Sequence, residues 1–320
     1  GHVLLFANVE LDDELLPGGA VYVPAGTPVE EREVSLDYEP YEYDSPEALD
    51  DELRRTGDLR LTPGVGLPSC PVGDEALALH PHVPAPHAAQ EHAGHTVTAV
   101  LCPESRGFAL DPAAVPEDAD LVVVGNPTNP TGVLHPAEAL RGLCRPGRLV
   151  VVDEAFMDAL PGEPESLAGE RIGGLVVLRS LTKHWSVPGI RAGYAVGDEA
   201  VVRGLARVQT PWSVSAPAIA ATVACTGEEA GAEAERRAAE FGEWRTGLEA
   251  GLRGAGIGFV PSRAPFVLVK AGEGVHARLR EQGIAVRRAD TFPGLDADWV
   301  RVAVRPPETT RKLLAALSAE

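Results

Sequence analysis

The sequence predicts an α/β fold with a mostly parallel sheet, followed by a smaller α+β domain. Five apolar runs rich in valine and leucine recur between residues 97 and 196, separated by helical or loop segments. Continuous apolar runs are typical of strands covered on both faces, as in a parallel sheet between helices. Beyond residue 216 the pattern changes to long alanine- and glutamate-rich stretches and then to short strands. A chain of 320 residues that is 44% hydrophobic can bury a core in each of two domains.

The chain is expected to divide into three segments. Residues 1–60 are predicted to form an N-terminal arm and connecting segment, residues 61–215 the large domain and residues 216–320 the small domain. Within the first segment, residues 21–23 could form a short strand and residues 45–55 a helix. Ser45 can cap that helix, and Pro46 suits its first position.

Each element of the two domains follows from local pattern. In the large domain, strands are predicted at 97–101, 121–124, 149–152, 175–178 and 194–196, and helices at 136–144 and 199–207. In the small domain, helices are predicted within 217–253 and at 274–282 and 307–319, with strands at 257–260, 266–270, 285–287 and 300–304. Ligands of parallel sheets bind beyond the carboxyl ends of the strands, so the residues after each strand are the candidates for a site.

Composition argues against several classes of function. A net charge of −19 and a pI near 4.9 make nucleic acid and anionic membranes poor partners. The first residues do not resemble a signal peptide, and no apolar run approaches the length of a membrane span. The four cysteines show no C-x-x-C spacing, which fits a reducing cytoplasm, and we expect a cytoplasmic protein. Five histidines lie between residues 80 and 95 without a convincing ligand partner, so we expect no metal site.

Three consecutive predicted strands end in polar residues. Residues 125–132 (G-N-P-T-N-P-T-G) follow the second strand, Asp153 follows the third, and S-L-T-K, which ends in Lys183, follows the fourth. Singly, these features could be a rigid turn, a helix cap and a surface loop. All three in this order indicate a site.

Lys183 is the centre of that site. A lysine flanked by apolar strands is partly desolvated, which lowers its pKa and frees the amine for imine chemistry. Donors suited to a phosphate ester lie around it in the sequence, namely Ser180, Thr182 and Arg191. The alternative for this stretch taken alone is a surface loop whose lysine points into water.

The order of these motifs resembles the aspartate-aminotransferase-like family (fold type I, class I/II) of pyridoxal-phosphate (PLP) enzymes. The stretch 180–193 is similar to the lysine signature of that class, position by position. The chain looks most like histidinol-phosphate aminotransferases and the threonine-phosphate decarboxylases of cobalamin biosynthesis, as found in actinobacteria. The resemblance covers residues 96–310 well. It implies a seven-stranded-type sheet in a three-layer αβα domain, and a homodimer with shared active sites.

The resemblance also implies roles for matching residues. Lys183 would form a Schiff base with PLP and later move the proton at Cα. Asp153 would pair with the pyridinium nitrogen, and Asn129 would donate to the phenolic oxygen of the ring. The phosphate would be held by Ser180, Thr182 and Arg191.

Further roles are implied outside the lysine motif. Arg301, on a predicted strand, would grip the substrate carboxylate. Asn8 resembles a residue that approaches the substrate, and Tyr43 one that reaches the phosphate of the neighbouring subunit. The glycine turn at Gly64 and Val65 resembles the phosphate cup of the family. A second substrate anion could meet Arg288 or Arg305, for which surface charge is the alternative.

Three departures from the family pattern stand out. Val83 occupies the position of the aromatic residue that stacks on the PLP ring, although His82 could stack instead. Pro68 follows the glycine turn, so that turn has no room for the usual helix. Phe156 stands where many aminotransferases have a tyrosine, and the threonine-phosphate decarboxylase group often has phenylalanine there.

Three functions therefore remain open from sequence. The first is a PLP-dependent aminotransferase acting at Cα of a small amino-acid substrate, phosphorylated or not. The second is a decarboxylase of the threonine-phosphate type. The third is a repurposed or non-catalytic relative whose degraded phosphate cup no longer holds PLP.

Overall fold

A computed structural model describes residues 2–6, 9–11, 14–16, 20–23, 75–82, 90, 95–209 and 211–318. The expected helix at 45–55 lies outside these residues. Within them, no helix combines the length and apolar character needed to cross a membrane. No group of three or more histidine, cysteine or acidic side chains in the described part of the chain could hold a metal ion.

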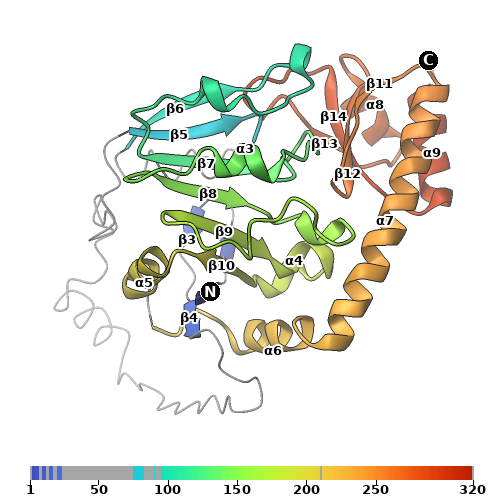
Figure 1. Ribbon diagram of the computed structural model, residues 1–320. Coiled ribbons are helices and arrows are strands. Elements are labelled where there is room, and N and C mark those ends of the chain that lie inside the picture. The colour runs from blue at the N-terminus through green and yellow to red at the C-terminus, as the bar shows by residue number, and fades with distance from the viewer. Residues whose placement is uncertain are drawn as a thin grey trace, which may run out of the picture.

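The large sheet has eight described strands in the order β4-β1-β10-β9-β8-β7-β5-β6 (Figure 1). Five adjacent strands pair in parallel, in the spatial order β6-β5-β7-β8-β9. The sheet then continues with β10, β1 and β4, which form antiparallel pairs. The strand bounds are β1 (His2–Phe6), β4 (Ala20–Val23), β5 (Glu75–His80), β6 (Thr96–Leu101), β7 (Leu121–Gly125), β8 (Leu149–Asp153), β9 (Leu175–Ser180) and β10 (Gly193–Gly197). A separate hairpin pairs β2 (Val9–Leu11) with β3 (Glu14–Leu16).

All five apolar runs predicted as strands form strands, so the mostly parallel α/β sheet is confirmed. The sheet gains strands that were not among those five. One of them, β5, is an alternating alanine and leucine run without β-branched residues, which is a weak strand signal. The others, β1 and β4, come from the segment expected to be an arm and extend the sheet beyond β10.

Helices cover the sheet on both faces because alternate strand residues point to opposite sides. On one face, the core contains Val150, Val152 and Val177 together with Leu140 of α3 (Ala137–Arg141). On the other, Leu149, Val176 and Ala195 pack with Val202 of α5 (Glu199–Val208). Asp198 caps α5 by accepting from the amides of Ala200 and Val201 at 2.8 and 3.1 Å.

The small domain is an antiparallel sheet in the order β11-β12-β14-β13, with helices packed against it. Its core includes Leu252, Val267, Val269, Val300 and Leu313. The bounds are α6 (Ala216–Cys225), α7 (Glu228–Gly254), β11 (Gly258–Val260), β12 (Phe266–Lys270), α8 (Val275–Glu281), β13 (Arg287–Arg288), β14 (Trp299–Ala303) and α9 (Pro307–Ser318).

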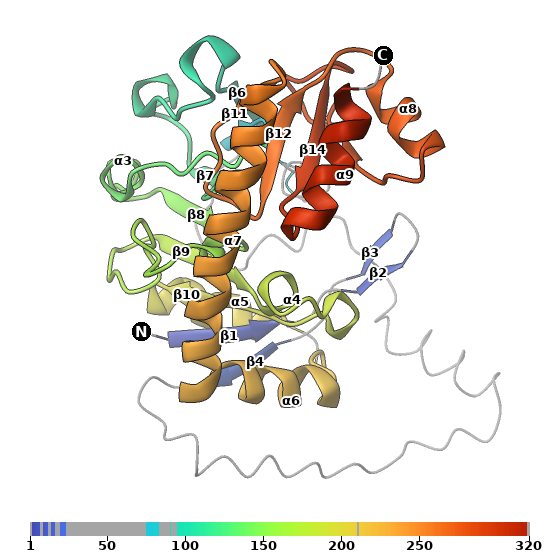
Figure 2. The same cartoon turned by 90° about the vertical axis from the view of Figure 1, so that its right-hand side faces the viewer.

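The long helix α7 connects the two parts of the molecule. Figures 1 and 2 show it running from beside α6 to the small sheet. Near its start, the carboxylate of Glu235 accepts from the amide of Gly162 in the large domain at 3.0 and 3.2 Å. Near its end, Leu248 and Leu252 are fully buried in the small-domain core. One helix therefore contacts a loop of the large domain and the core of the small domain.

The loop after β7 packs closely against the small domain at Gly132. Its φ of +71° lies in the left-handed region, and an added Cβ would come within 1.9 Å of Ser262 Oγ. That hydroxyl cannot easily move, because Ser262 is buried and accepts from the amide of Ala264 at 3.0 Å. The amide of Arg263 also donates to the Gly132 carbonyl at 2.7 Å.

Gly132→Ala is therefore expected to lower the free energy of unfolding by about 3 kcal/mol, combining left-handed strain with a steric clash. Gly107→Ala is the matched control, because Gly107 has a φ of +62° with nothing within 4 Å of its added Cβ. The control should lose only about 1 kcal/mol. Urea unfolding followed by circular dichroism measures both. Equal losses of unfolding free energy in the two variants would show that the close approach of Gly132 to Ser262 adds nothing to the cost.

Candidate active site

Asp153 and the Lys183 turn lie at the carboxyl ends of neighbouring parallel strands. Asp153 is the last residue of β8 and is paired in register with Gly125 of β7 and Leu178 of β9. Two residues beyond Leu178, β9 ends at Ser180, and the short helix α4 (Leu181–His184) carries Lys183. The three strands that precede the predicted site residues, β7, β8 and β9, are therefore parallel neighbours whose carboxyl ends lie at one edge of the sheet.

The hydroxyls predicted to hold a phosphate lie together. Ser180 Oγ and Thr182 Oγ1 are 2.9 Å apart. Arg191 follows the short 3-10 helix η5 (Pro188–Ile190) in a left-handed conformation (φ 56°), and its Nη1 donates to the carbonyl of Pro188 at 2.8 Å. That contact ties the guanidinium to its own turn.

Lys183 differs from the other lysines of the chain. The sequence contains three, and the remaining two are Lys270 and Lys312. Lys270 pairs with Glu104 at 2.9 Å and Lys312 with Glu308 at 3.1 Å, with all four side chains exposed. Only Lys183 of the three lies in the turn that follows β9, at the edge where Asp153 ends β8.

His82 lies against Asp153 and forms one side of the site. Its side chain is buried, and its Nε2 is 3.8 Å from Asp153 Oδ2. The imidazole also lies over Gly125, where a Cβ would come within 2.5 Å of the ring. The other carboxylate oxygen of Asp153 accepts from the amide of Ala155 at 3.0 Å. A flat ring thus stands beside the carboxylate, as expected if His82 replaces the stacking aromatic; Val83 lies outside the described residues.

Arg301 reaches the site from the small domain. Its Nη1 donates to Asn129 Oδ1 at 2.5 Å, and its guanidinium lies 4.8 Å from the ring of Phe266. Phe156 packs edge-on against the same ring, with centroids 4.9 Å apart. Because the amide oxygen of Asn129 faces Arg301, the NH₂ of that side chain is the group left to donate elsewhere.

The charge of Arg301 is not neutralised by a carboxylate of the described chain within ion-pair distance. Burial, together with the neighbouring Arg287, lowers the pKa of Arg301 to about 10. The guanidinium therefore stays protonated at neutral pH and is available to an anion.

The loop that carries Asn129 is fixed by His135, which the sequence analysis did not assign to the site. The amide of Leu110 donates to His135 Nδ1 at 3.3 Å, so the proton of the neutral ring is on Nε2, 2.9 Å from Thr128 Oγ1. The hydroxyl of Thr128 donates in turn to the carbonyl of Gly125 at 2.8 Å. Burial lowers the pKa of His135 to about 4, which keeps the ring in this neutral form.

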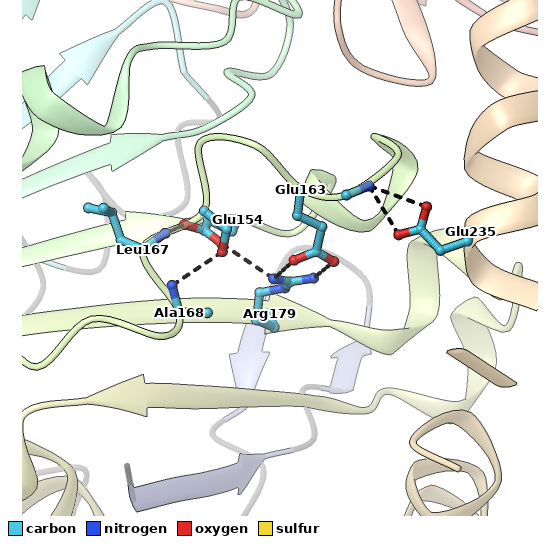
Figure 3. A network of polar contacts seen from close by, with 8 residues as sticks. Glu154, Glu163, Leu167, Ala168, Arg179 and Glu235 are labelled. Atoms are coloured by element: carbon cyan, nitrogen blue, oxygen red, sulfur yellow. Dashed lines mark hydrogen bonds and ion pairs between the residues drawn. The ribbon is translucent and has the colours of Figure 1, made fainter. Parts of the chain in front are cut away.

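A buried ionic network also joins β8 to β9, and sequence analysis did not identify it. Arg179 donates to both carboxylate oxygens of Glu163 at 2.7 and 2.5 Å and lies 3.4 Å from Glu154 Oε2 (Figure 3). Glu154 also accepts from Ser166 Oγ at 2.6 Å and from the amide of Leu167 at 2.7 Å. The available signal was a charged residue at the end of each of two adjacent apolar strands.

Four predicted site residues have no structural description here. Asn8, Tyr43, Gly64 and Val65 lie outside the described residues, so their roles remain predictions. The site that can be described consists of the residues after β7, β8 and β9 together with Arg301 of β14.

Relatives share both the sequence pattern and the fold. A histidinol-phosphate aminotransferase of Mycobacterium tuberculosis is 50% identical over 201 residues, which are 62% of this chain and 55% of that protein. A threonine-phosphate decarboxylase of Sinorhizobium sp is 38% identical over 228 residues, which are 66% of this chain and 64% of that protein. The chain thus spans little more than half of the mycobacterial relative and under two thirds of the other.

Solved structures of aminotransferases superpose on the chain. An aspartate aminotransferase of Thermus thermophilus, a tetra mutant, gives a TM-score of 0.68 at 28% identity, covering 77% of this chain and 73% of that one. The histidinol-phosphate aminotransferase of Clostridium acetobutylicum gives 0.68 at 26% identity, covering 77% of each. The family model for aminotransferase class I and II matches residues 69–317. This chain belongs to the class I and II aminotransferase family.

Proposed function

We propose that the protein is a PLP-dependent aminotransferase that acts at the amine-bearing carbon of a small substrate. The observation that carries this proposal is the placement of Asp153 and Lys183 after adjacent parallel strands, with Arg301 approaching from the small domain. A carboxylate, an amine and a charged guanidinium thus belong to one site. The family supports the same reaction class.

The residues present fit PLP by their chemistry. The amine of Lys183 suits the aldehyde, the carboxylate of Asp153 suits the pyridine nitrogen, and the paired hydroxyls of Ser180 and Thr182 suit the phosphate. His82 supplies a flat ring beside Asp153. When bound, PLP supplies an electron sink for the bonds at the substrate carbon.

The side chains of this chain then divide the remaining work. Lys183 Nζ takes the proton from the substrate carbon and returns it, which requires a neutral amine. Arg301 binds an anionic group of the substrate and orients it. Asn129, held by Arg301, directs its NH₂ group as a donor. Phe156 and Phe266 form an apolar wall under the guanidinium that limits access of water.

A second anion-binding residue, Arg287, stands opposite Arg301. The two arginines are register partners in the antiparallel pair β13–β14, so their side chains are on the same face. Like charges directly opposite each other repel, and a bound anion relieves that repulsion. Arg288, which sequence analysis considered for this role, instead pairs with Asp290 at the surface. A substrate with two anionic groups or a phosphate therefore suits the site.

Decarboxylation is the second candidate. It is favoured by Phe156, whose ring packs where many aminotransferases have a tyrosine hydroxyl, and by the relative named a threonine-phosphate decarboxylase. Both candidates use the same lysine, carboxylate and arginine. They differ in which bond at the substrate carbon is held perpendicular to the cofactor ring.

Lys183→Ala is expected to abolish the visible absorbance that wild-type protein gains with PLP, because neither of the other two lysines, Lys270 and Lys312, lies at this edge of the sheet. Lys270→Ala is the matched control, since Lys270 is exposed and paired with Glu104, and it should leave the absorbance unchanged. Absorbance scans after dialysis measure both. A wild-type protein without such absorbance would support the repurposed relative and overturn the proposal.

With O-phosphothreonine or histidinol phosphate and a 2-oxo acid acceptor, the protein is expected to transfer the amino group. Amino-acid analysis detects the newly aminated acceptor, and a carbon dioxide assay runs in parallel with O-phosphothreonine. Carbon dioxide release without amino transfer would replace transamination by decarboxylation.

Arg287→Ala is expected to raise the KM for O-phosphothreonine about tenfold or more, because one charge-assisted contact is lost. The KM for threonine, which lacks the phosphate, should change little. Arg288→Ala, the adjacent surface arginine, is the matched control and should affect neither. Equal effects of Arg287→Ala on both substrates would contradict a role in binding the second anion.

A further inference from the structure

The network around Arg179 lies on the face of the sheet opposite the candidate active site. Glu154 directly follows Asp153, and Arg179 directly precedes Ser180. Side chains alternate along a strand, and the neighbours Val152 and Val177 belong to the core on the α3 face. Glu154 and Arg179 therefore point to that face, whereas Asp153 and Ser180 point to the other.

The ends of β8 and β9 are held together by contacts on the α3 face of the sheet. Glu154 is fully buried, Arg179 is nearly so, and the amide of Glu154 donates to the carbonyl of Leu178 at 2.9 Å. A buried, bidentate guanidinium contact is geometrically specific, because two parallel hydrogen bonds fix both distance and orientation. Any shift of β8 against β9 would break contacts at Glu154 and Arg179 and would also separate Asp153 from the turn of Lys183.

The backbone at Glu163 is held in a conformation that the network must stabilise. Glu163 has a φ of +43° in the left-handed region, which is unfavourable for a residue with a Cβ. Such residues persist where the surrounding contacts determine them, and here the contacts are the two bonds to Arg179. The preceding amide, that of Gly162, is bound by Glu235 of α7.

The network contains more carboxyl groups than it has positive charge. Asp158, in the 3-10 helix η4 (Met157–Ala159), is partly buried near Arg179, and its buried Oδ1 atom has no hydrogen-bond partner among the described residues. Burial raises the pKa of Asp158 to about 7, and burial also raises the pKa of Glu154. One guanidinium thus serves Glu154 and Glu163, while Asp158 carries a proton below that pH.

We propose that Arg179, Glu154 and Glu163 are positioning residues of the active site, setting the separation of Asp153 and Lys183 from the opposite face of the sheet. The proposal rests on the proposed function insofar as Asp153 and Lys183 act on PLP. The network itself touches neither substrate nor cofactor and acts through the two strand ends.

Glu163→Gln tests the proposal, because Glu163 lies at the edge of the network with its side chain 33% exposed. Arg179 is unsuitable, since its removal leaves buried carboxylates unpaired and the fold is expected to fail. Glu170→Gln is the matched control: Glu170 lies in the same loop, pairs with Arg141 at 2.8 Å and is 34% exposed.

The first readout needs no cofactor. Hydrogen exchange of the purified protein is expected to quicken about tenfold in Glu163→Gln within residues 149–155 and 178–184, and to stay at the wild-type rate in β12 and β14. Glu170→Gln should match wild type throughout. Unchanged exchange in both segments, or an equal increase across the whole chain, would overturn the proposal.

The second readout distinguishes positioning from stability alone. With PLP bound, Glu163→Gln is expected to lower the pH midpoint of the absorbance of the bound cofactor by about half a unit, because the carboxylate of Asp153 moves away from Lys183. A midpoint equal to wild type would overturn the positioning role. If wild type itself gains no absorbance, the proposed function fails, and the exchange comparison alone decides whether the network holds the strand ends.

A milder variant protects the test if Glu163→Gln does not fold. Ser166→Ala removes one hydroxyl donor from Glu154 and should change both readouts in the same direction but less. Ser318→Ala is its control, since Ser318 donates to the carbonyl of Leu314 at the surface of α9. If Glu163→Gln does not fold, wild-type values of both readouts for Ser166→Ala would refute the proposal.

Discussion

The parallel pairing of β7, β8 and β9 is the constraint on which the rest of the site depends. It fixes Gly125, Asp153 and Leu178 side by side, and the chemistry-bearing groups follow within a few residues of each. Because all three strands point the same way, their carboxyl ends share one edge. A change of register by one residue would turn Asp153 to the face that Glu154 now occupies.

Two arginines lie near the candidate site on different sides, Arg179 buried and Arg301 partly buried, and their surroundings differ. The charge of Arg179 is neutralised by the carboxylates of Glu154 and Glu163, and these ion pairs hold the loop after β8 against β9. Arg301 faces a neutral amide and an aromatic ring, which orient the guanidinium without neutralising it. A partly desolvated cation that has no carboxylate partner among the described residues is suited to recognise an anion. The same side-chain chemistry thus supports a proposed role in holding structure for Arg179 and in recognition for Arg301.

Much of this arrangement could be predicted from sequence, and the exceptions have physical reasons. Valine-rich strands such as β8 are recognisable because residues 149–152 are all apolar, and Asp153 is conspicuous at the end of that run. Strand β5 was not predicted, because alanine and leucine suit a helix as well as a strand. Contacts between distant segments, such as Asn129 with Arg301 or Arg179 with Glu163, depend on tertiary packing that no local pattern reports.

Helix α7 has a mechanical consequence for how the protein can evolve. Its 27 residues span about 40 Å, long enough to reach from a loop of the large domain to the small-domain core. In the first half of the helix the guanidinium of Arg237 lies 5.1 Å from the centroid of the Trp185 ring, two residues after Lys183, and near the far end Leu252 is buried in the small-domain core. A substitution near the small sheet that shifts α7 would therefore also disturb the contact between Arg237 and Trp185 beside the lysine turn. Under the proposed function, substrate range and cofactor geometry are expected to be linked, so that adaptation of one requires compensation in the other.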